Sequence, residues 1–402
     1  MKNSLKSLKD IFLKGAFPKQ LVVQICDNCN ADCPQCGMNK GNNFKRSRLS
    51  PAKIKEIIDK ASDSGVHAIS FTGGEPFLYE SDLLKAITYA TNKNIVYTRT
   101  GTNGFMFTNS KSAYFEDRIK SLAEKIKKSG LYTFWISIDT YDIEKHEKNR
   151  GLKGVIDGVE KGLKIFESFD LYPSVNLGIN RLIEDDDYRY YKDGNFHGEI
   201  FYESYVSGLR KFFNFAAELG FTISNMCYPM SSDNAVYKAE SKDQMVSYSK
   251  EERILIFKSL LKVIPEFREK IRIFTPLSSV TSIINHYEKN SGPKFPCYGG
   301  DFYFFISSTS GLYPCGFKND NCMGNYENLG GTPLRLNCTD CDWECFRDPS
   351  NLIAPLINIR TKPIEQIKDF IRNREFYKTW LRDISYFRRC NFFDMRTRFR
   401  PI

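Results

Sequence analysis

The chain has 402 residues, of which 41% are hydrophobic, and its 58 Lys and Arg against 48 Asp and Glu give a net charge of +10. This length allows one large catalytic domain and a smaller second one. The basic residues are scattered along the chain, so the charge indicates no nucleic-acid partner. No apolar run approaches the ~20 residues that cross a bilayer, which excludes a membrane-spanning helix.

Residues 1–20 are an N-terminal amphipathic segment, with Leu5, Leu8 and Phe12 at helical spacing among lysines. The segment lacks the continuous apolar stretch of a signal peptide. We therefore expect a cytoplasmic protein with no membrane partner.

Apolar, β-rich runs alternate with helical patterns through the first 230 residues, which is typical of a parallel sheet with crossover helices. The predicted strands are residues 21–25, 67–72, 95–100, 132–138, 174–179 and 222–226. The predicted helices are residues 51–64, 82–91, 114–129, 155–169 and 205–219. Six such repeats without a seventh or eighth predict an α/β fold, a partial (β/α)6 TIM-like barrel over residues 21–230. Ligands are then expected at the carboxyl ends of the strands.

The second half of the chain changes in composition twice. Helical periodicity dominates residues 231–293, which we interpret as a helical linker. Residues 294–350 are rich in Cys and Gly and indicate a small second domain, and residues 351–402 are expected to form a helical tail. The residues 302–306 and 311–315 read as the two arms of a β-hairpin.

The twelve cysteines are clustered: four lie between Cys26 and Cys36, and six between Cys297 and Cys345. In a large chain without an export signal, such a count indicates metal or redox chemistry rather than disulfides.

Cys29, Cys33 and Cys36 follow the first predicted strand on one loop. Three thiolates on such a loop can each bind one iron of a [4Fe–4S] cluster and leave the fourth iron open to another ligand. Cys26 makes a fourth cysteine, so a tetrahedral zinc site is the alternative.

The run Gly73-Gly74-Glu75-Pro76 ends the second predicted strand. The two glycines let the backbone approach a ligand closely, and the proline fixes the turn that follows.

A Cys-x3-Cys-x2-Cys loop followed one βα unit later by Gly-Gly-Glu-Pro resembles the radical S-adenosylmethionine (SAM) superfamily. The resemblance implies that the three cysteines of the loop bind a [4Fe–4S] cluster whose open iron is chelated by SAM. It also implies that residues 73–76 meet the SAM amino group. The chain has Gln35 where the family usually has an aromatic residue, and Cys26 matches no family ligand, so we interpret Cys26 as a packing residue.

Ser137 and Asp139 lie on one face of the fourth predicted strand, because side chains alternate along a strand. Together with His146 and Arg150-Gly151 they resemble a pattern common in the same superfamily. The resemblance implies that Ser137 or Asp139 contacts the ribose and that Arg150 contacts the SAM carboxylate. An Asp at a strand end can instead cap the following turn.

Asparagines near the strand ends are further candidate contacts. Asn103 ends the third strand in a way that resembles the family. Asn176 and Asn180, near the end of the fifth strand, are candidate adenosine or substrate contacts, and the alternative is that they satisfy loop backbone groups.

The second cysteine cluster resembles the auxiliary-cluster domains of radical SAM enzymes called SPASM and, in shortened form, twitch. The resemblance implies one auxiliary [4Fe–4S] cluster, with two possible only if seven cysteines are recruited. The ligands expected for one cluster are Cys297, Cys315, Cys338 and Cys341, with Cys345 as the leading substitute. A zinc ribbon is the alternative.

The resemblance implies an enzyme that takes an electron from an external flavodoxin- or ferredoxin-type donor and cleaves SAM to a 5′-deoxyadenosyl radical, which abstracts a substrate hydrogen atom. An auxiliary cluster near the substrate would accept a second electron, making the enzyme an oxidoreductase. We favour oxidative modification of a ribosomally made peptide. The alternatives are dehydrogenation or epimerisation of a small molecule such as an aminosugar or cyclitol, and a non-catalytic iron–sulfur or zinc scaffold protein.

Cys227, at the end of the sixth predicted strand, is the candidate catalytic residue of the epimerising alternative. A thiol there could return a hydrogen atom to the opposite face of a carbon radical. The alternative is an inert buried thiol, since free Cys is among the most buried residue types.

Overall fold

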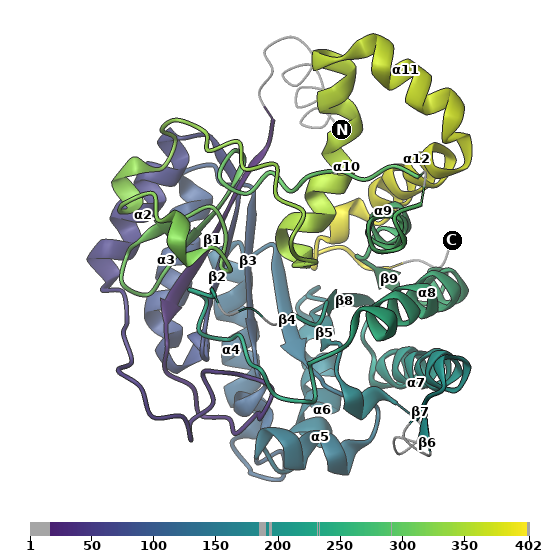
Figure 1. The fold of residues 1–402 in the computed structure, drawn as a ribbon. Helices are drawn as coiled ribbons and strands as arrows, with labels where there is room; N and C mark the ends of the chain where they lie inside the picture. Colours follow the sequence, from purple (N-terminus) through teal and green to yellow (C-terminus); the bar gives the residue numbers. More distant parts are fainter. Residues whose placement is uncertain are drawn as a thin grey trace.

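The computed structural model describes residues 17–184, 190–192, 195–230, 232, 234–290 and 292–399. A single nine-stranded sheet with the order β11-β10-β1-β2-β3-β4-β5-β8-β9 runs through this part of the chain (Figure 1). Its six central strands are β1 (Lys19–Cys26), β2 (Val66–Gly73), β3 (Tyr97–Thr102), β4 (Thr133–Ser137), β5 (Ser174–Gly178) and β8 (Ile223–Cys227). All five pairings between them are parallel. The predicted α/β fold, a partial barrel with six parallel strands, is confirmed.

Helices cover the outer face of these strands. They are α2 (Pro51–Asp63), α3 (Glu80–Asn92), α4 (Phe115–Ser129), α5 (Ile143–Arg150), α6 (Val155–Ser168), α7 (Gly198–Leu219) and α8 (Lys250–Phe267). The start of α2 is typical: the Ser50 hydroxyl accepts a hydrogen bond from the backbone N–H of Lys53 at 3.2 Å, and a proline occupies the first helical position. Such a cap satisfies a backbone donor that the helix itself cannot pair.

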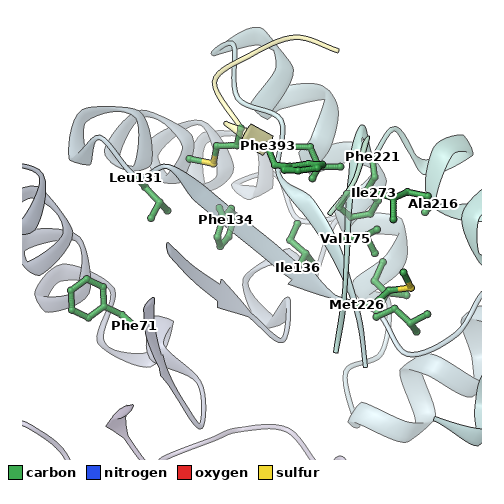
Figure 2. Packing of buried hydrophobic residues seen from close by; sticks show 14 of the residues in the cluster. Phe71, Leu131, Phe134, Ile136, Val175, Ala216, Phe221, Met226, Ile273 and Phe393 are labelled. Atoms are coloured by element: carbon green, nitrogen blue, oxygen red, sulfur yellow. The ribbon is translucent and has the colours of Figure 1, made fainter. Parts of the chain in front are cut away.

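The strands bury side chains on both faces, because helices cover one side and later segments of the chain cover the other. In β1, Leu21 and Val23 pack in the main core with the outer helices. Val22, which points the opposite way, packs with Phe305 and Trp343 inside the barrel. Figure 2 shows part of the main core, with labelled side chains from β2 (Phe71), β4 (Phe134 and Ile136), β5 (Val175) and β8 (Met226) that belong to one hydrophobic cluster.

The cysteine-rich region shares the barrel sheet. Strand β10 (Tyr303–Ile306) pairs in parallel with β1, and β11 (Leu312–Tyr313) pairs antiparallel with β10. The predicted hairpin is therefore present, but it extends the barrel sheet at its β1 edge. At the other edge, β9 (Arg272–Ile273) extends β8. The predicted domain boundaries at residues 294 and 350 remain a prediction.

The remaining elements lie beyond the barrel strands. They are β6 (Tyr191–Lys192), β7 (Asn195–Phe196), α9 (Leu277–Glu288), α10 (Glu344–Thr361), α11 (Pro363–Arg372) and α12 (Arg374–Arg389), with short 3-10 turns that include η2 (Pro76–Tyr79) and η4 (Arg181–Ile183). Helix α10 begins against the barrel, where the Gln20 side chain of β1 donates to the Cys345 carbonyl at 2.9 Å. Within the described residues no helix has the length and apolar character needed to span a bilayer.

Candidate active site

The loop after β1 brings three thiols together. Cys33 is buried, and Cys29 and Cys36 are half-buried. Burial raises the pKa of Cys33 to about 12 and that of Cys36 to about 11, and the thiols are near enough for charge on one to raise the pKa of another. A ligand group that neutralises thiolates is therefore needed before all three can ionise together. Among the described residues, no three His, Cys, Asp or Glu side chains are placed to hold a single metal ion.

Cys26 differs from the loop cysteines. Its thiol lies 3.9 Å from the Asn28 carbonyl and 3.8 Å from the Glu75 carbonyl, and a Cβ on Gly73 would lie 3.0 Å from its sulfur. It is fully buried between β1 and β2. These contacts are those of the packing residue that we predicted.

Glycines 73 and 74 let the end of β2 rest on the start of the cysteine loop. A Cβ on Gly73 would lie 2.4 Å from the Cys26 carbonyl oxygen, and one on Gly74 would lie 2.2 Å from the Asn28 carbonyl oxygen. The N–H groups of Gly74 and Glu75 donate to these carbonyls at 3.0 and 2.7 Å. Any larger side chain would push the two strand ends apart.

The Glu75 carboxylate ties β2 to β3. It is 1% exposed, and it accepts the backbone N–H groups of Phe77 at 3.0 Å and Asn103 at 2.6 Å. Burial raises the pKa of this carboxyl to about 7, against the opposing effect of those hydrogen bonds. Pro76 begins the turn η2 directly after it. Whether residues 73–76 also meet the SAM amino group remains a prediction.

Asn103 holds the cysteine loop from the end of β3. Its amide donates to Asn30 Oδ1 at 2.8 Å and lies 3.8 Å from Cys29 Sγ. A donor aimed at a sulfur favours the thiolate form and is a common neighbour of iron–sulfur ligands.

Asp139 and Arg150 form a buried ion pair beside the same loop. Arg150 donates through Nε at 2.9 Å and Nη2 at 2.5 Å to the two carboxylate oxygens. Burial alone would raise the pKa of Asp139, but the charge of Arg150 and the hydrogen bonds from Arg150 and Asn149 offset it and lower that pKa. Burial lowers the pKa of the neighbouring His146 to about 4, so that its ring is neutral. Arg150 also lowers the pKa of Cys33, so its charge favours the thiolate. The predicted contacts of this pair with SAM remain predictions.

The end of α5 is fastened to the cysteine loop. The Asn149 amide donates both to Asp139 Oδ2 at 2.9 Å and to Gln35 Oε1 at 3.0 Å, and the Asp32 N–H donates to the Arg150 carbonyl at 3.0 Å. Gln35, which stands in place of the family's usual aromatic residue, therefore helps to position the loop.

Asparagines line the ends of the next strands. Asn176 is paired in register with Ser137 and accepts a hydrogen bond from Asn225 at 2.7 Å. The Asn180 amide donates to the Asp139 carbonyl at 2.9 Å. Asn180 thus satisfies backbone groups, which was the alternative to a ligand contact, while Asn176 and Ser137 remain candidate contacts.

A group of thiols and one acid lies on the inner side of the barrel. Cys227 lies 3.5 Å from Asn176 Oδ1, and Cys345 lies 3.3 Å from Glu344 Oε1. Burial raises the pKa of both thiols well above its usual value, and the Glu344 carboxylate raises it further. Sequence reasoning missed Glu344, because nothing in the spacing of residues 338–345 shows which side chains of α10 turn toward the barrel.

Four cysteines line a single cavity of about 230 Å³ beyond β10. They are Cys297, Cys315, Cys338 and Cys341. A backbone hydrogen bond of 2.8 Å from the Cys297 N–H to the Cys338 carbonyl holds two of their segments together. The cavity therefore brings together the four residues expected as auxiliary ligands. Cys345 is absent from its lining, and Cys322 is exposed with its thiol toward the Gly324 carbonyl.

Tyr237 lies between the two cysteine sites and was not predicted. Its hydroxyl is 2.8 Å from Thr72 Oγ1, next to the Gly-Gly-Glu-Pro turn, and its ring centroid is 6.2 Å from that of Trp343, which lines the four-cysteine cavity. Two backbone N–H groups, of Val236 and Tyr237, donate to the Gly316 carbonyl at 2.9 Å. The residue stands in an irregular segment without a motif, so the sequence carried no signal for it.

The open α/β barrel and the clustered cysteines at its mouth place this chain in the class of partial-barrel enzymes with a redox site at the strand ends. The model of the radical SAM superfamily matches residues 23–181, which include the cysteine loop, the glycine turn and Arg150. This part of the chain is therefore a radical SAM domain, and enzymes of this superfamily use a [4Fe–4S] cluster and SAM.

Two kinds of curated relative are similar to this chain. The AdoMet-dependent heme synthase of Nitratidesulfovibrio vulgaris is 23% identical over 320 residues, covering 77% of this chain and 76% of the relative. The probable GTP 3′,8-cyclase of Pyrococcus abyssi is 30% identical over 171 residues, covering 42% of this chain and 49% of the relative. The chain therefore spans about half the length of this cyclase.

Two solved structures share the fold at low sequence identity. Streptococcus suis SuiB bound to its precursor peptide SuiA has a TM-score of 0.50 at 16% identity, covering 83% of this chain and 67% of that one. Native anSMEcpe with bound AdoMet has a TM-score of 0.50 at 15% identity, covering 79% of each chain.

Proposed function

We propose that this chain is a radical SAM oxidoreductase that abstracts a hydrogen atom from a ribosomally made peptide and oxidises it. The observation that carries the proposal is the presence of two separate cysteine sites on one sheet. Three thiols follow β1, and four line the cavity beyond β10, which is hydrogen-bonded to β1. Two redox sites on a shared rigid sheet suit a reaction that moves two electrons in separate steps.

At the first site, Cys29, Cys33 and Cys36 would hold the [4Fe–4S] cluster and leave one iron open for SAM. This cluster, when bound, supplies the electron that cleaves SAM. An external protein of flavodoxin or ferredoxin type would give that electron to the cluster. The chain's own part is to hold the loop through Asn103 and to favour thiolates with the charge of Arg150.

At the second site, four thiols are a complete ligand set for one auxiliary [4Fe–4S] cluster. The cavity offers no fifth cysteine among the described residues, so we propose one such cluster. Trp343 lines this cavity and packs against Tyr237, whose hydroxyl lies beside Thr72 at the end of β2. These contacts support a role in which the cluster would take up the second electron from a substrate at the barrel mouth.

The substrate class rests on the fold neighbours. SuiB is bound to a precursor peptide, and anSMEcpe is also known with bound peptides. The heme synthases, which match three quarters of this chain, favour a second candidate, oxidation of a small molecule.

Replacing Cys29, Cys33 and Cys36 together with Ala tests the first site. We expect the anaerobically reconstituted, dithionite-reduced triple variant to release no 5′-deoxyadenosine from SAM and to keep about four iron atoms per chain at the auxiliary site. The matched control is Cys26→Ala, which removes a neighbouring packing thiol and should still cleave SAM. Release at the wild-type rate by the triple variant would refute the assignment, and a wild type that cleaves no SAM would favour a scaffold protein.

Cys227 tests the epimerising alternative. Burial keeps its thiol protonated, as a hydrogen-atom donor must be. With the substrate in hand and the reaction run in deuterated water, a donor would place solvent deuterium at the reacting carbon, and Cys227→Ala would lose that product. Because we propose oxidation, we expect the variant to form full product and the wild-type product to carry no deuterium there.

A further inference from the structure

A buried arginine lies beside the four-cysteine cavity without a carboxylate partner. Arg347, in the first turn of α10, is 5% exposed. Its Nε and Nη2 donate to the Cys341 carbonyl at 3.0 and 2.8 Å, Nη2 also lies 3.5 Å from the Cys338 carbonyl, and Nη1 donates to the Phe295 carbonyl at 3.0 Å. Within the described part of the chain, no carboxylate lies at ion-pair distance from it. All of its hydrogen bonds therefore end on neutral backbone oxygens.

A full positive charge in a protein interior is costly unless a negative charge lies near it. The charge of Arg347 acts to lower the pKa of the Asp342 and Asp340 carboxyls, but each of these is already paired with another cation, Asp342 with Arg253 at 3.5 Å and Asp340 with Lys318 at 2.5 Å. Arg347 itself donates to the Cys341 carbonyl, so its charge lies beside the four-cysteine cavity. A [4Fe–4S] cluster with four thiolate ligands carries net negative charge and becomes more negative when reduced. The cation and the cavity are thus complementary in charge.

A second cation at the same cavity is already neutralised. Lys318 also lines the cavity, but its Nζ lies 2.5 Å from Asp340 Oδ2 and its side chain is 26% exposed. Solvent and the carboxylate together screen its charge. Arg347, in contrast, is buried and makes no ion pair within the described residues.

We propose that Arg347 is the counter-cation of the auxiliary cluster and raises its reduction potential. The inference rests on the auxiliary cluster of the proposed function. A fixed positive charge in a low-dielectric site stabilises the reduced, more negative state relative to the oxidised one. The substrate radical then loses one electron to the oxidised cluster and one proton to solvent, which completes a two-electron oxidation. The cluster passes its electron on to an oxidised flavodoxin- or ferredoxin-type protein.

The test uses the full chain with Cys29, Cys33 and Cys36 replaced by Ala, so that only the auxiliary cluster is present. The variants Arg347→Gln, Arg347→Lys and Lys318→Gln are added to this background, reconstituted anaerobically and titrated by electron paramagnetic resonance. We expect a more negative midpoint potential for Arg347→Gln, and a potential close to the parent for Arg347→Lys and for the matched control Lys318→Gln. A purely structural role would change iron content without moving the potential.

The other outcomes distinguish the role of Arg347 from the existence of the auxiliary cluster. If the Arg347→Gln cluster has the parent potential, the role of Arg347 is wrong while the auxiliary cluster stands. If Arg347→Gln holds no iron, Arg347→Lys decides: the parent potential supports the charge assignment, and a negative shift overturns it. If the parent itself binds no auxiliary iron, the auxiliary cluster of the proposed function is wrong, and the role of Arg347 falls with it.

Discussion

The pKa values of buried acids in this protein are shifted in opposite directions, according to the neighbours of each acid. Asp139 keeps a lowered pKa because the charge of Arg150 and the hydrogen bonds from Arg150 and Asn149 compensate for its burial. Glu75 accepts hydrogen bonds from backbone N–H groups and from the Thr102 side chain, and the charge of Arg150 has a smaller effect, so desolvation dominates and its pKa rises. Asp348 is a third case, in which hydroxyl groups are the neighbours. Its oxygens accept from Ser279 Oγ at 2.6 Å and Tyr228 Oη at 3.2 Å.

Asp348 should make the protein less stable as the pH rises. Burial raises its pKa to about 8, whereas the unfolded chain has the ordinary value of ~3.9. The unfolded state therefore releases this proton first, and the free energy of unfolding falls as the pH rises from about 4 to about 8. Asp348→Asn keeps the shape and cannot ionise. Between pH 5 and pH 7, wild type should lose about 2 kcal/mol more than the variant in anaerobic urea unfolding. Equal losses in the two proteins would mean that Asp348 is ionised in the folded state.

At the scale of elements, two strand glycines differ in the space around them. Gly101 in β3 lies under the Trp135 indole of β4, and a Cβ there would lie 1.8 Å from Trp135 Nε1. Gly178 in β5 has no atom within 4 Å of the position of a Cβ. The same substitution at the two sites therefore separates steric conflict from the general effect of losing a glycine.

Gly101→Ala should displace the Trp135 ring or the strand beneath it. Overpacking of this kind costs roughly 1–3 kcal/mol. Gly178→Ala, the matched control, should be neutral or slightly stabilising, because it only reduces the freedom of the unfolded chain. Urea unfolding gives both values, and near-ultraviolet circular dichroism reports the Trp environment. A Gly101→Ala protein as stable as Gly178→Ala would show that the indole moves aside without cost.

The elements differ in how far the sequence could predict them. Strand β1 is an apolar run buried on both faces, and β4 alternates buried with half-buried residues, and local sequence carries both patterns. The pairing of β10 with β1 joins residues some 280 positions apart, for which no local pattern exists. From its spacing to Cys341 in the sequence, Cys345 was predicted as a substitute ligand. Because α10 begins at Glu344, the helical turn carries Cys345 toward the barrel, and spacing cannot specify that rotation.

At the scale of the whole molecule, the cysteine-rich region extends one edge of the barrel sheet through backbone pairing, and closes over the open barrel by reaching from β1 to the end of β8 through α10. β10 extends the sheet at β1, and the start of α10 meets β1 and β8: Gln20 donates to the Cys345 carbonyl, and Glu344 accepts the Tyr228 N–H at 3.2 Å. The four cavity cysteines come from three separate segments of the chain. A group bound by all four would therefore cross-link the segments that close the barrel.

Loading of the auxiliary site should protect this closure from local opening. Binding to the closed form alone lowers the population of open states, and a bound cluster removes chain entropy from them. In full-length protein, we expect hydrogen exchange at β10 and the first turns of α10 to slow by roughly tenfold or more on reconstitution, which corresponds to ~1.4 kcal/mol or more. Cys297→Ser should abolish this protection, while Cys322→Ser, the matched control at an exposed cysteine of the same region, should keep it. Exchange in α4 and α6, which pack against each other away from the cysteine-rich region, should be alike in all four samples. If Cys322→Ser loses the protection and Cys297→Ser keeps it, the cavity is not the site at which the group binds.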